Sequence, residues 1–219
     1  MPELITMLTH NDVTAPNSIE LFMGAKDAPC NYWGFKDIGI SEDEMKRLVD
    51  AMKENGKTVF MESLAYSEKN TMESLELASR CGVEYVLGAT YYENAAAFAS
   101  AYHIRFSPFI GLRNSGRLYG DIEELVFYAK ERVKHDVFGI NISAYRYEGD
   151  CGELIQRVVA AVDKPVSVAG SVDCFEKLAS IKASGCWAFT VGGALFEHKF
   201  GDTFANQIEI ITQFLNDAS

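Results

Sequence analysis

Short apolar runs recur along the whole chain, and each is followed by a stretch with the spacing of an amphipathic helix. The runs are rich in β-branched and aromatic residues and end in small or polar ones. They begin about 26 residues apart, close to the length of one strand–helix unit in a barrel. We expect eight strands, at residues 4–10, 31–37, 58–64, 83–90, 104–112, 137–143, 165–171 and 187–195.

The stretches between these runs carry helix signals. Residues 41–56 begin with Ser41 and Glu44, the spacing of a capping box, and end on Gly56. A second helix is expected to start at Thr71, and Asp121 is expected to cap a third. The expected helices cover residues 18–28, 41–56, 71–82, 93–103, 121–136, 151–163, 173–185 and 202–216.

Strands that alternate with helices pair in parallel through crossover connections. Seven or eight such units favour a closed (β/α)8 TIM barrel, an α/β fold, over an open doubly wound sheet. No GxGxxG follows the first run, so a dinucleotide-binding Rossmann fold is not indicated. No linker or change of composition divides the chain, and we predict one domain over residues 1–219. A flavodoxin-like open sheet is the structural alternative.

The charge and the cysteines exclude several classes of function. The formal net charge is -11, which disfavours binding to a nucleic-acid backbone. The 5 cysteines are widely spaced and form no CxxC, so neither a disulfide framework nor a structural zinc site is expected. No leader and no apolar run long enough to cross a membrane is visible. These features predict a cytoplasmic protein without nucleic-acid or membrane partners, and they allow a homo-oligomer.

Two glycine turns close the last two strands. Gly170 and Ser171 follow the seventh strand, and Gly192 and Gly193 follow the eighth, ahead of a short helical turn at Ala194. Exposed backbone N–H groups at such turns, in the last two units of a barrel, are the usual phosphate clamp. Glycines also serve tight turns alone. We favour phosphate binding because both turns occur together.

The motifs "VAGSV" and "FTVGGALFE" resemble the last strands of the ribulose-phosphate-binding barrels, which include histidine- and tryptophan-biosynthesis enzymes and ribulose-phosphate epimerase. "FGINIS" is similar to the sixth strand of indole-glycerol-phosphate synthase, and this resemblance implies that Asn141 contacts substrate. That enzyme's catalytic acid and base do not recur here in the matching strands. The block layout also resembles the glycerol-3-phosphate-responsive antiterminator family, which implies ligand binding without turnover.

Function in a barrel lies at the carboxyl ends of the strands, so the polar residues there are the candidates for chemistry. Catalytic candidates are Lys36, Glu62, His10 and Asp37, and further substrate-binding candidates are Asp12, Thr90, Arg113 and Asn141. Successive strand residues alternate faces, so only one of Lys36 and Asp37 should enter the barrel mouth. We expect it to be Lys36, beside Glu62.

Each candidate also has a plainer interpretation. Lys36 and Glu62 could form only a salt bridge, and Asp12 could only support its turn. His10 could be a structural histidine, and Arg113 a solvated loop residue. A divalent metal could be bound by His10, Asp37 and Glu62, but no motif supports it, and we predict no cofactor.

The sequence therefore favours an enzyme that acts on a small phosphorylated metabolite by proton transfer next to a carbonyl, as an isomerase, epimerase or lyase. A ligand-sensing barrel without turnover is the alternative, although an RNA-binding role fits poorly with the negative charge. A barrel whose site has degenerated is the third interpretation.

Overall fold

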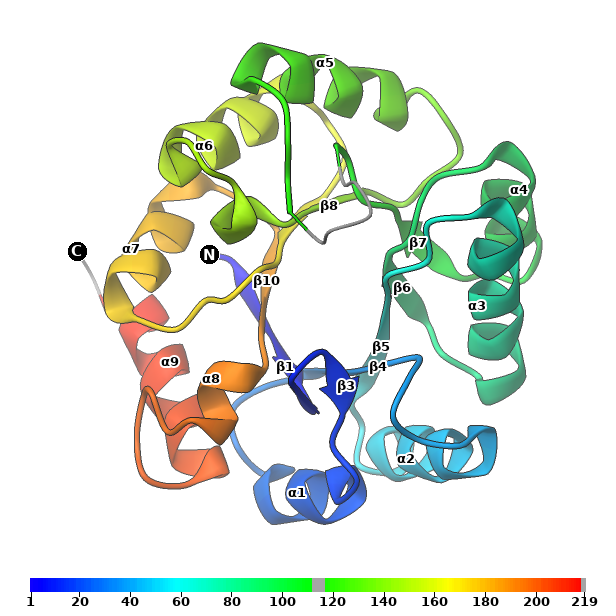
Figure 1. Cartoon of the computed structure of the whole chain (residues 1–219). Helices are drawn as coiled ribbons and strands as arrows, with labels where there is room; N and C mark the ends of the chain where they lie inside the picture. The colour runs from blue at the N-terminus through cyan, green and yellow to red at the C-terminus, as the bar shows by residue number, and fades with distance from the viewer. Residues whose placement is uncertain (112–116, 218–219) are drawn as a thin grey trace.

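Eight parallel strands form the sheet at the centre of the molecule (Figure 1). The computed structural model describes residues 1–111 and 117–217. The strands are β1 (Glu3–Met7), β4 (Tyr32–Lys36), β5 (Thr58–Ser63), β6 (Tyr85–Gly88), β7 (Arg105–Ser107), β8 (Ile140–Ile142), β9 (Val166–Val168) and β10 (Ala188–Val191). They pair in the order β7-β6-β5-β4-β1-β10-β9-β8.

The two edge strands of this sheet, β7 and β8, approach each other at a seam, and a β-bridge joins them just beyond the end of β7. Phe109 pairs with Asn141 in parallel, and the Asn141 N–H donates to the Pro108 carbonyl at 2.9 Å. Near the start of the seam, the Phe138 N–H donates to the Phe106 carbonyl at 2.9 Å. The sheet is therefore a nearly closed barrel. The predicted TIM-barrel fold is confirmed, and the open flavodoxin-like alternative is wrong.

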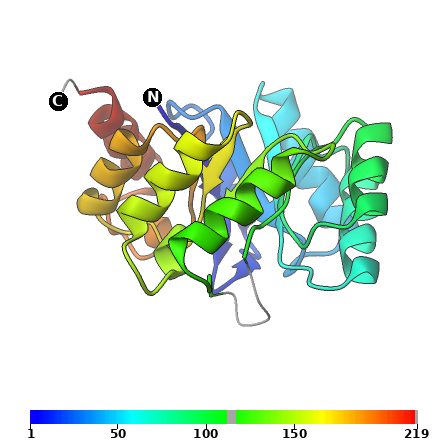
Figure 2. The same ribbon diagram turned by 90° about the horizontal axis from the view of Figure 1, so that it is seen from above.

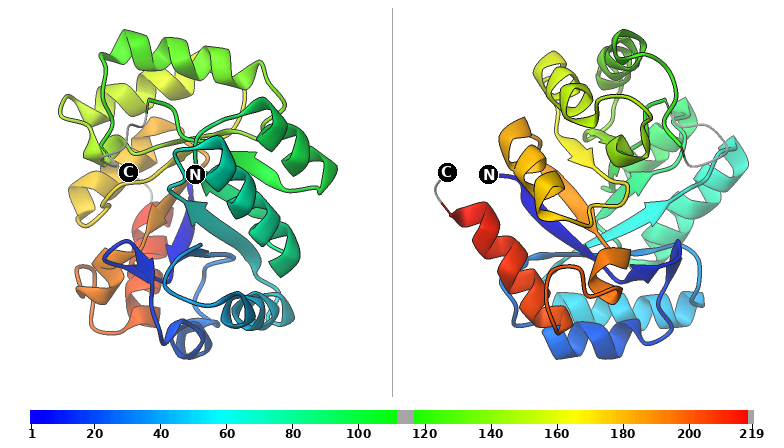
Figure 3. Two further views of the ribbon diagram at one scale, coloured as in Figure 1. Left: turned by 45° about the vertical axis from the view of Figure 1, so that its right-hand side comes forward. Right: turned by 60° about the vertical axis from the view of Figure 1, so that its left-hand side comes forward.

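Helices surround this barrel as an outer layer (Figures 1 and 2). They are α1 (Ser18–Ala25), α2 (Glu42–Glu54), α3 (Glu68–Cys81), α4 (Glu93–Ala101), α5 (Ile122–Val133), α6 (Cys151–Ala161), α7 (Phe175–Ser184), α8 (Gly193–Phe196) and α9 (Phe204–Asn216), with a 3-10 turn η1 (Ala144–Arg146). A small hairpin, β2 (Thr9–His10) and β3 (Val13–Thr14), follows β1 and lies beside α8 (Figure 3). No helix in these described ranges combines the length and apolarity needed to span a membrane.

Local capping explains where most helices begin. The predicted capping box of α2 is confirmed: the Ser41 hydroxyl accepts from the Glu44 N–H, and the Glu44 carboxylate accepts from the Ser41 N–H. Asp121 caps α5 as predicted. The predicted start of α3 at Thr71 is wrong, because the helix begins three residues earlier, after the N-cap Ser67.

The core has two layers, as expected when a barrel is covered by helices. Between strands and helices lies the larger apolar layer, built from outward-facing strand residues such as Trp33, Phe35 and Met61. Inside the barrel, aromatic rings fill the amino-terminal half. The Phe60 and Tyr85 rings stack with centroids 4.3 Å apart. The rings of this inner cluster belong to Tyr32, Phe60, Tyr85, Phe138 and Trp187. Open space is consequently found at the other end, where the strands finish.

Candidate active site

A pocket of about 250 Å³ lies at the carboxyl ends of the strands. Its walls come from the hairpin after β1, from the ends of β4, β5 and β10, and from the segments after β8, β9 and β10. We call it the central pocket. It brings together eight of the predicted site residues: His10, Asp12, Lys36, Glu62, Gly170, Ser171, Gly192 and Gly193.

Lys36 and Glu62 are neighbours across β4 and β5. They are partners in the strand register, so both side chains point to the same face of the sheet, into the barrel. The Lys36 Nζ lies 3.6 Å from the Glu62 Oε2, and the two side chains are only 5% and 12% exposed. A buried ammonium needs a counter-charge, and here the Glu62 carboxylate in the pocket wall supplies it.

Asp12 is the second carboxylate that forms an ion pair with Lys36. Its Oδ1 accepts from the Lys36 Nζ at 2.7 Å and from the Arg146 Nη2 at 3.1 Å. Asp12 stands with Asn11 at the tip of the β2–β3 hairpin, and both have the positive φ of a two-residue hairpin turn, 62° and 51°. Burial raises the pKa of Asp12, but the hydrogen bonds and charges of Lys36 and Arg146 outweigh it and bring that pKa below its usual range.

Arg146 is a residue of this pocket that the sequence prediction missed. It belongs to η1, directly after β8. Its guanidinium donates a hydrogen bond to Asp12, which lies 134 positions earlier in the chain. The available signal was a basic residue three positions after the end of "FGINIS". The 3-10 turn carries it back over the mouth.

The two predicted phosphate turns follow the neighbouring strands β9 and β10, and both line the central pocket. Gly170 and Ser171 have φ of 96° and 62°, the left-handed backbone that glycine adopts most easily. Gly192 precedes the short helix α8, whose first N–H groups have no intrahelical acceptor. A Cβ at Gly193 would meet nothing closer than the His10 ring at 3.9 Å, so its backbone is open to a ligand.

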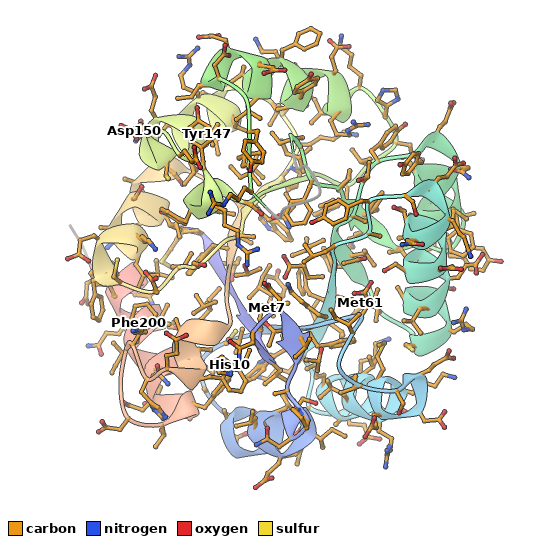
Figure 4. The ribbon with its side chains drawn as sticks, viewed as in Figure 1. Met7, His10, Met61, Tyr147, Asp150 and Phe200 are labelled. Atoms are coloured by element: carbon orange, nitrogen blue, oxygen red, sulfur yellow. The ribbon has the colours of Figure 1, made fainter. Side chains whose placement is uncertain are left out.

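His10 borders the α8 turn. Its ring stacks on Phe196 with centroids 5.2 Å apart and planes 13° apart. In Figure 4 His10 lies beside α8, while Met7 lies nearer the barrel centre. The stacking fixes the imidazole at the edge of the pocket, where it can exchange a proton or donate to an anion.

Two carboxylates also line the central pocket near the two glycine turns. Asp173 is paired with Lys177 at 2.7 Å, and Glu197 follows the last turn of α8. They lie beside the two glycine turns and limit how much negative charge this end of the pocket accepts.

Three further predicted site residues lie outside the lining of the central pocket. Asp37 faces outward and accepts from the Ser74 hydroxyl at 2.6 Å, because it alternates with the inward-facing Lys36. Thr90 lines a separate depression with Tyr91 and Arg132. Asn141 is fully buried in the barrel interior, outside the pocket lining. Arg113 lies outside the described residues.

Asn141 lies buried on β8 and makes a side-chain hydrogen bond to the neighbouring strand β9. Its Oδ1 accepts from the Ser167 hydroxyl at 3.0 Å, and its Nδ2 is buried with no partner among the described residues. The substrate contact that the resemblance implies for Asn141 stays a prediction.

One of the three predicted metal ligands, Asp37, does not line the central pocket. His10 and Glu62 both line the central pocket, but Asp37 points towards α3 on the other side of the strand. Over residues 1–111 and 117–217, no group of three or more His, Cys, Asp or Glu side chains is arranged to hold a metal ion.

Comparison with known proteins extends the description of the fold. No protein-family model and no curated protein matches the sequence. Among solved structures, the chain is similar to orotidine 5'-phosphate decarboxylase from Pyrococcus horikoshii OT3, with a TM-score of 0.75 and 12% identity over 98% of this chain and 100% of that chain. It is also similar to N-(5'-phosphoribosyl)anthranilate isomerase from Pyrococcus furiosus, with a TM-score of 0.67 and 10% identity over 98% and 97% of the two chains.

A third similar structure is tryptophan synthase from M. tuberculosis, with a TM-score of 0.68 and 13% identity over 98% of this chain and 92% of that chain. These neighbours match nearly the whole of this chain in fold. At such low identities the likeness establishes the fold of this chain, which is that of a TIM barrel.

Proposed function

We propose that this protein is an enzyme that moves a proton next to the carbonyl group of a small phosphorylated metabolite. One observation carries the proposal: a single pocket holds a nearly buried lysine–carboxylate pair together with two glycine turns. The pair suits acid–base chemistry, and the turns suit a phosphate. A volume of about 250 Å³ suits a small metabolite.

Glu62 is the proposed base. Its carboxylate would take the proton from the carbon next to the carbonyl, and the electron pair of that C–H bond would move onto the carbonyl oxygen. The Lys36 ammonium, 3.6 Å from Glu62, would stabilise the resulting enolate. Return of the proton to the carbonyl carbon, with transfer of the neighbouring hydroxyl proton to the enolate oxygen, gives an isomerase, and return of a proton to the original carbon from the opposite face gives an epimerase. In a lyase, Glu62 would instead take the proton of a β-hydroxyl group. The carbon–carbon bond would break to give an aldehyde and an enolate, and the enolate would then be protonated.

The phosphate is proposed to rest on the turns of Gly170, Ser171, Gly192 and Gly193. Backbone N–H groups there need no conformational change to meet an anion. Two of the similar structures have names that include a phosphate or phosphoribosyl group, which supports the proposal by analogy of fold. We also propose that the enzyme works in the cytoplasm and uses only groups of its own chain.

Deuterium exchange tests the proposal without knowledge of the product. The protein is incubated in D₂O with a panel of phosphorylated aldoses, ketoses and keto acids, and proton NMR follows the signal next to the carbonyl. We expect exchange with at least one compound. Glu62→Gln should slow it by about 100-fold or more, because a positioned general base is worth that much, while binding persists.

Asp37→Asn is the matched control, because Asp37 is adjacent to Lys36 in sequence but faces α3. It should exchange at the wild-type rate. If compounds bind but none exchanges or turns over, the enzyme proposal fails, and the ligand-sensing alternative takes its place.

A further inference from the structure

One carboxylate oxygen occupies the space between the two cations of the central pocket. The Asp12 Oδ1 lies 2.7 Å from the Lys36 Nζ and 3.1 Å from the Arg146 Nη2. Lys36 is 5% exposed and Arg146 32%, whereas Asp12 is 53% exposed. An ammonium and a guanidinium that converge on one carboxylate form a strong, charge-assisted recognition site for that group.

The charge of the pocket is unfavourable for an anionic ligand while Asp12 stays in place. Among the described residues its lining has two cationic side chains, Lys36 and Arg146. It has four carboxylates, those of Asp12, Glu62, Asp173 and Glu197. A phosphate ester brings a further charge of about -1.5 to -2. Withdrawal of Asp12 removes one negative charge and releases both cations from this carboxylate, while Lys36 keeps Glu62 at 3.6 Å.

Asp12 can withdraw because the base of its hairpin is anchored independently of the Asp12 side chain. The Thr14 hydroxyl donates to the Lys36 carbonyl at 2.7 Å and accepts from the Lys36 N–H at 2.8 Å, and these bonds are buried. The tip residues Asn11 and Asp12 are exposed. Rotation of the Asp12 side chain into solvent therefore leaves the hairpin and β4 intact.

We propose that the substrate carries a carboxylate in addition to its phosphate, and that this carboxylate replaces that of Asp12 between Lys36 and Arg146. The inference rests on the proposed function, because it needs the phosphate on the glycine turns. It narrows the substrate class to small phosphorylated carboxylic acids, with Arg146 as the residue that selects them. Asp12 then acts as a displaceable placeholder that keeps Lys36 and Arg146 paired while the site is empty.

Two probes separate the carboxylate from the phosphate. Glycerol 3-phosphate and 3-phosphoglycerate have the same length and phosphate, and only the second has a carboxylate. Calorimetric titration of the wild type should show tighter binding of 3-phosphoglycerate. Asp12→Asn should tighten 3-phosphoglycerate by about tenfold or more, the scale of one charged hydrogen bond, and should change glycerol 3-phosphate less.

Arg146→Gln supplies the independent test. It should remove the preference for 3-phosphoglycerate and leave the affinity for glycerol 3-phosphate within about twofold, because it removes only the carboxylate partner. A weaker affinity for 3-phosphoglycerate in Asp12→Asn would overturn the inference, since Asp12 would then assist binding.

The remaining outcomes distinguish this inference from the proposed function. Equal binding of both probes by the wild type would overturn the inference and leave the phosphate site standing. Failure of both probes to bind any variant would overturn both. Tight binding of 3-phosphoglycerate without proton exchange on any phosphorylated carbonyl compound would overturn only the enzyme proposal.

Discussion

Lys36 sits between two carboxylates at the end of β4, and this position determines what it can do. A lysine that is 5% exposed is stable as a cation only with close counter-charges, and Asp12 and Glu62 provide them. Such a partnered ammonium suits the stabilisation of an enolate better than nucleophilic attack, which needs the neutral amine. We therefore assign it an electrostatic role in the proposed reaction.

The Asp12 contacts make a pH-dependent contribution to stability. Because the pKa of Asp12 is lower in the folded protein than its usual 3.8, these contacts stabilise the fold above that pH. The contribution is lost as the pH falls through the lower, folded-state value. We expect the free energy of unfolding of Asp12→Asn to fall below that of the wild type at pH 7. The gap should narrow at about pH 3, as measured by urea denaturation. An equal gap at both pH values would contradict this account.

Part of the site could be predicted from the sequence because strand parity is a local property. Lys36 and Asp37 alternate, so the inward position of one implies the outward position of the other. The contact of Arg146 with Asp12 was not predictable in this way. It joins positions 134 apart and depends on the path of η1 and of the hairpin tip across the closed barrel.

At the scale of the elements, the turn and cap signals located most helices, and tertiary contacts decided the exceptions. Thr71 and Glu73 looked like the start of α3, yet Thr71 is buried and its hydroxyl donates to the Thr90 carbonyl at 3.3 Å. The N-cap is Ser67, whose hydroxyl accepts from the Asn70 N–H. The sequence could not reveal that Thr71 packs against the loop that follows β6.

Removal of this cap has a measurable cost. Ser67→Ala should lower the free energy of unfolding by about 1 kcal/mol, because the Asn70 N–H loses its acceptor. The matched control is Ser79→Ala inside the same helix, where alanine is the better helix former and no loss is expected. Chemical denaturation of both variants measures the difference. Equal stabilities of the two would show that Ser67 does not cap α3.

At the scale of the whole molecule, the barrel depends on close contact between β1, β4 and β5. A Cβ at Gly34 would lie 2.5 Å from the Met7 Sδ and 3.2 Å from the Phe60 Cβ. The repeat of strands and helices predicted this barrel, because eight units of similar length admit few other arrangements. The repeat could not predict which residue at each strand end reaches the central pocket. Asn141 and Thr90, expected there, lie outside its lining.

This packing predicts opposite effects for two glycine substitutions. Gly34→Ala should destabilise the fold by about 1–3 kcal/mol through overpacking of the barrel interior. Gly24→Ala, on the exposed face of α1, has nothing within 4 Å of the new Cβ and should be neutral or stabilise by about 0.5–1 kcal/mol. Urea denaturation of the two variants measures both effects. A neutral Gly34→Ala would contradict the tight interior.

Both proposals require that the turns after β9 and β10 hold a phosphate. The most direct measurement is a titration of the isotopically labelled protein with glycerol 3-phosphate, followed through its backbone amide NMR signals. The account predicts saturable shifts concentrated at Ser171, Val172, Gly193 and Ala194, which line the central pocket at the two turns. Gly193→Pro would remove one of these N–H groups and should weaken binding. Shifts that cluster elsewhere, or no shift at saturating ligand, would contradict the central claim.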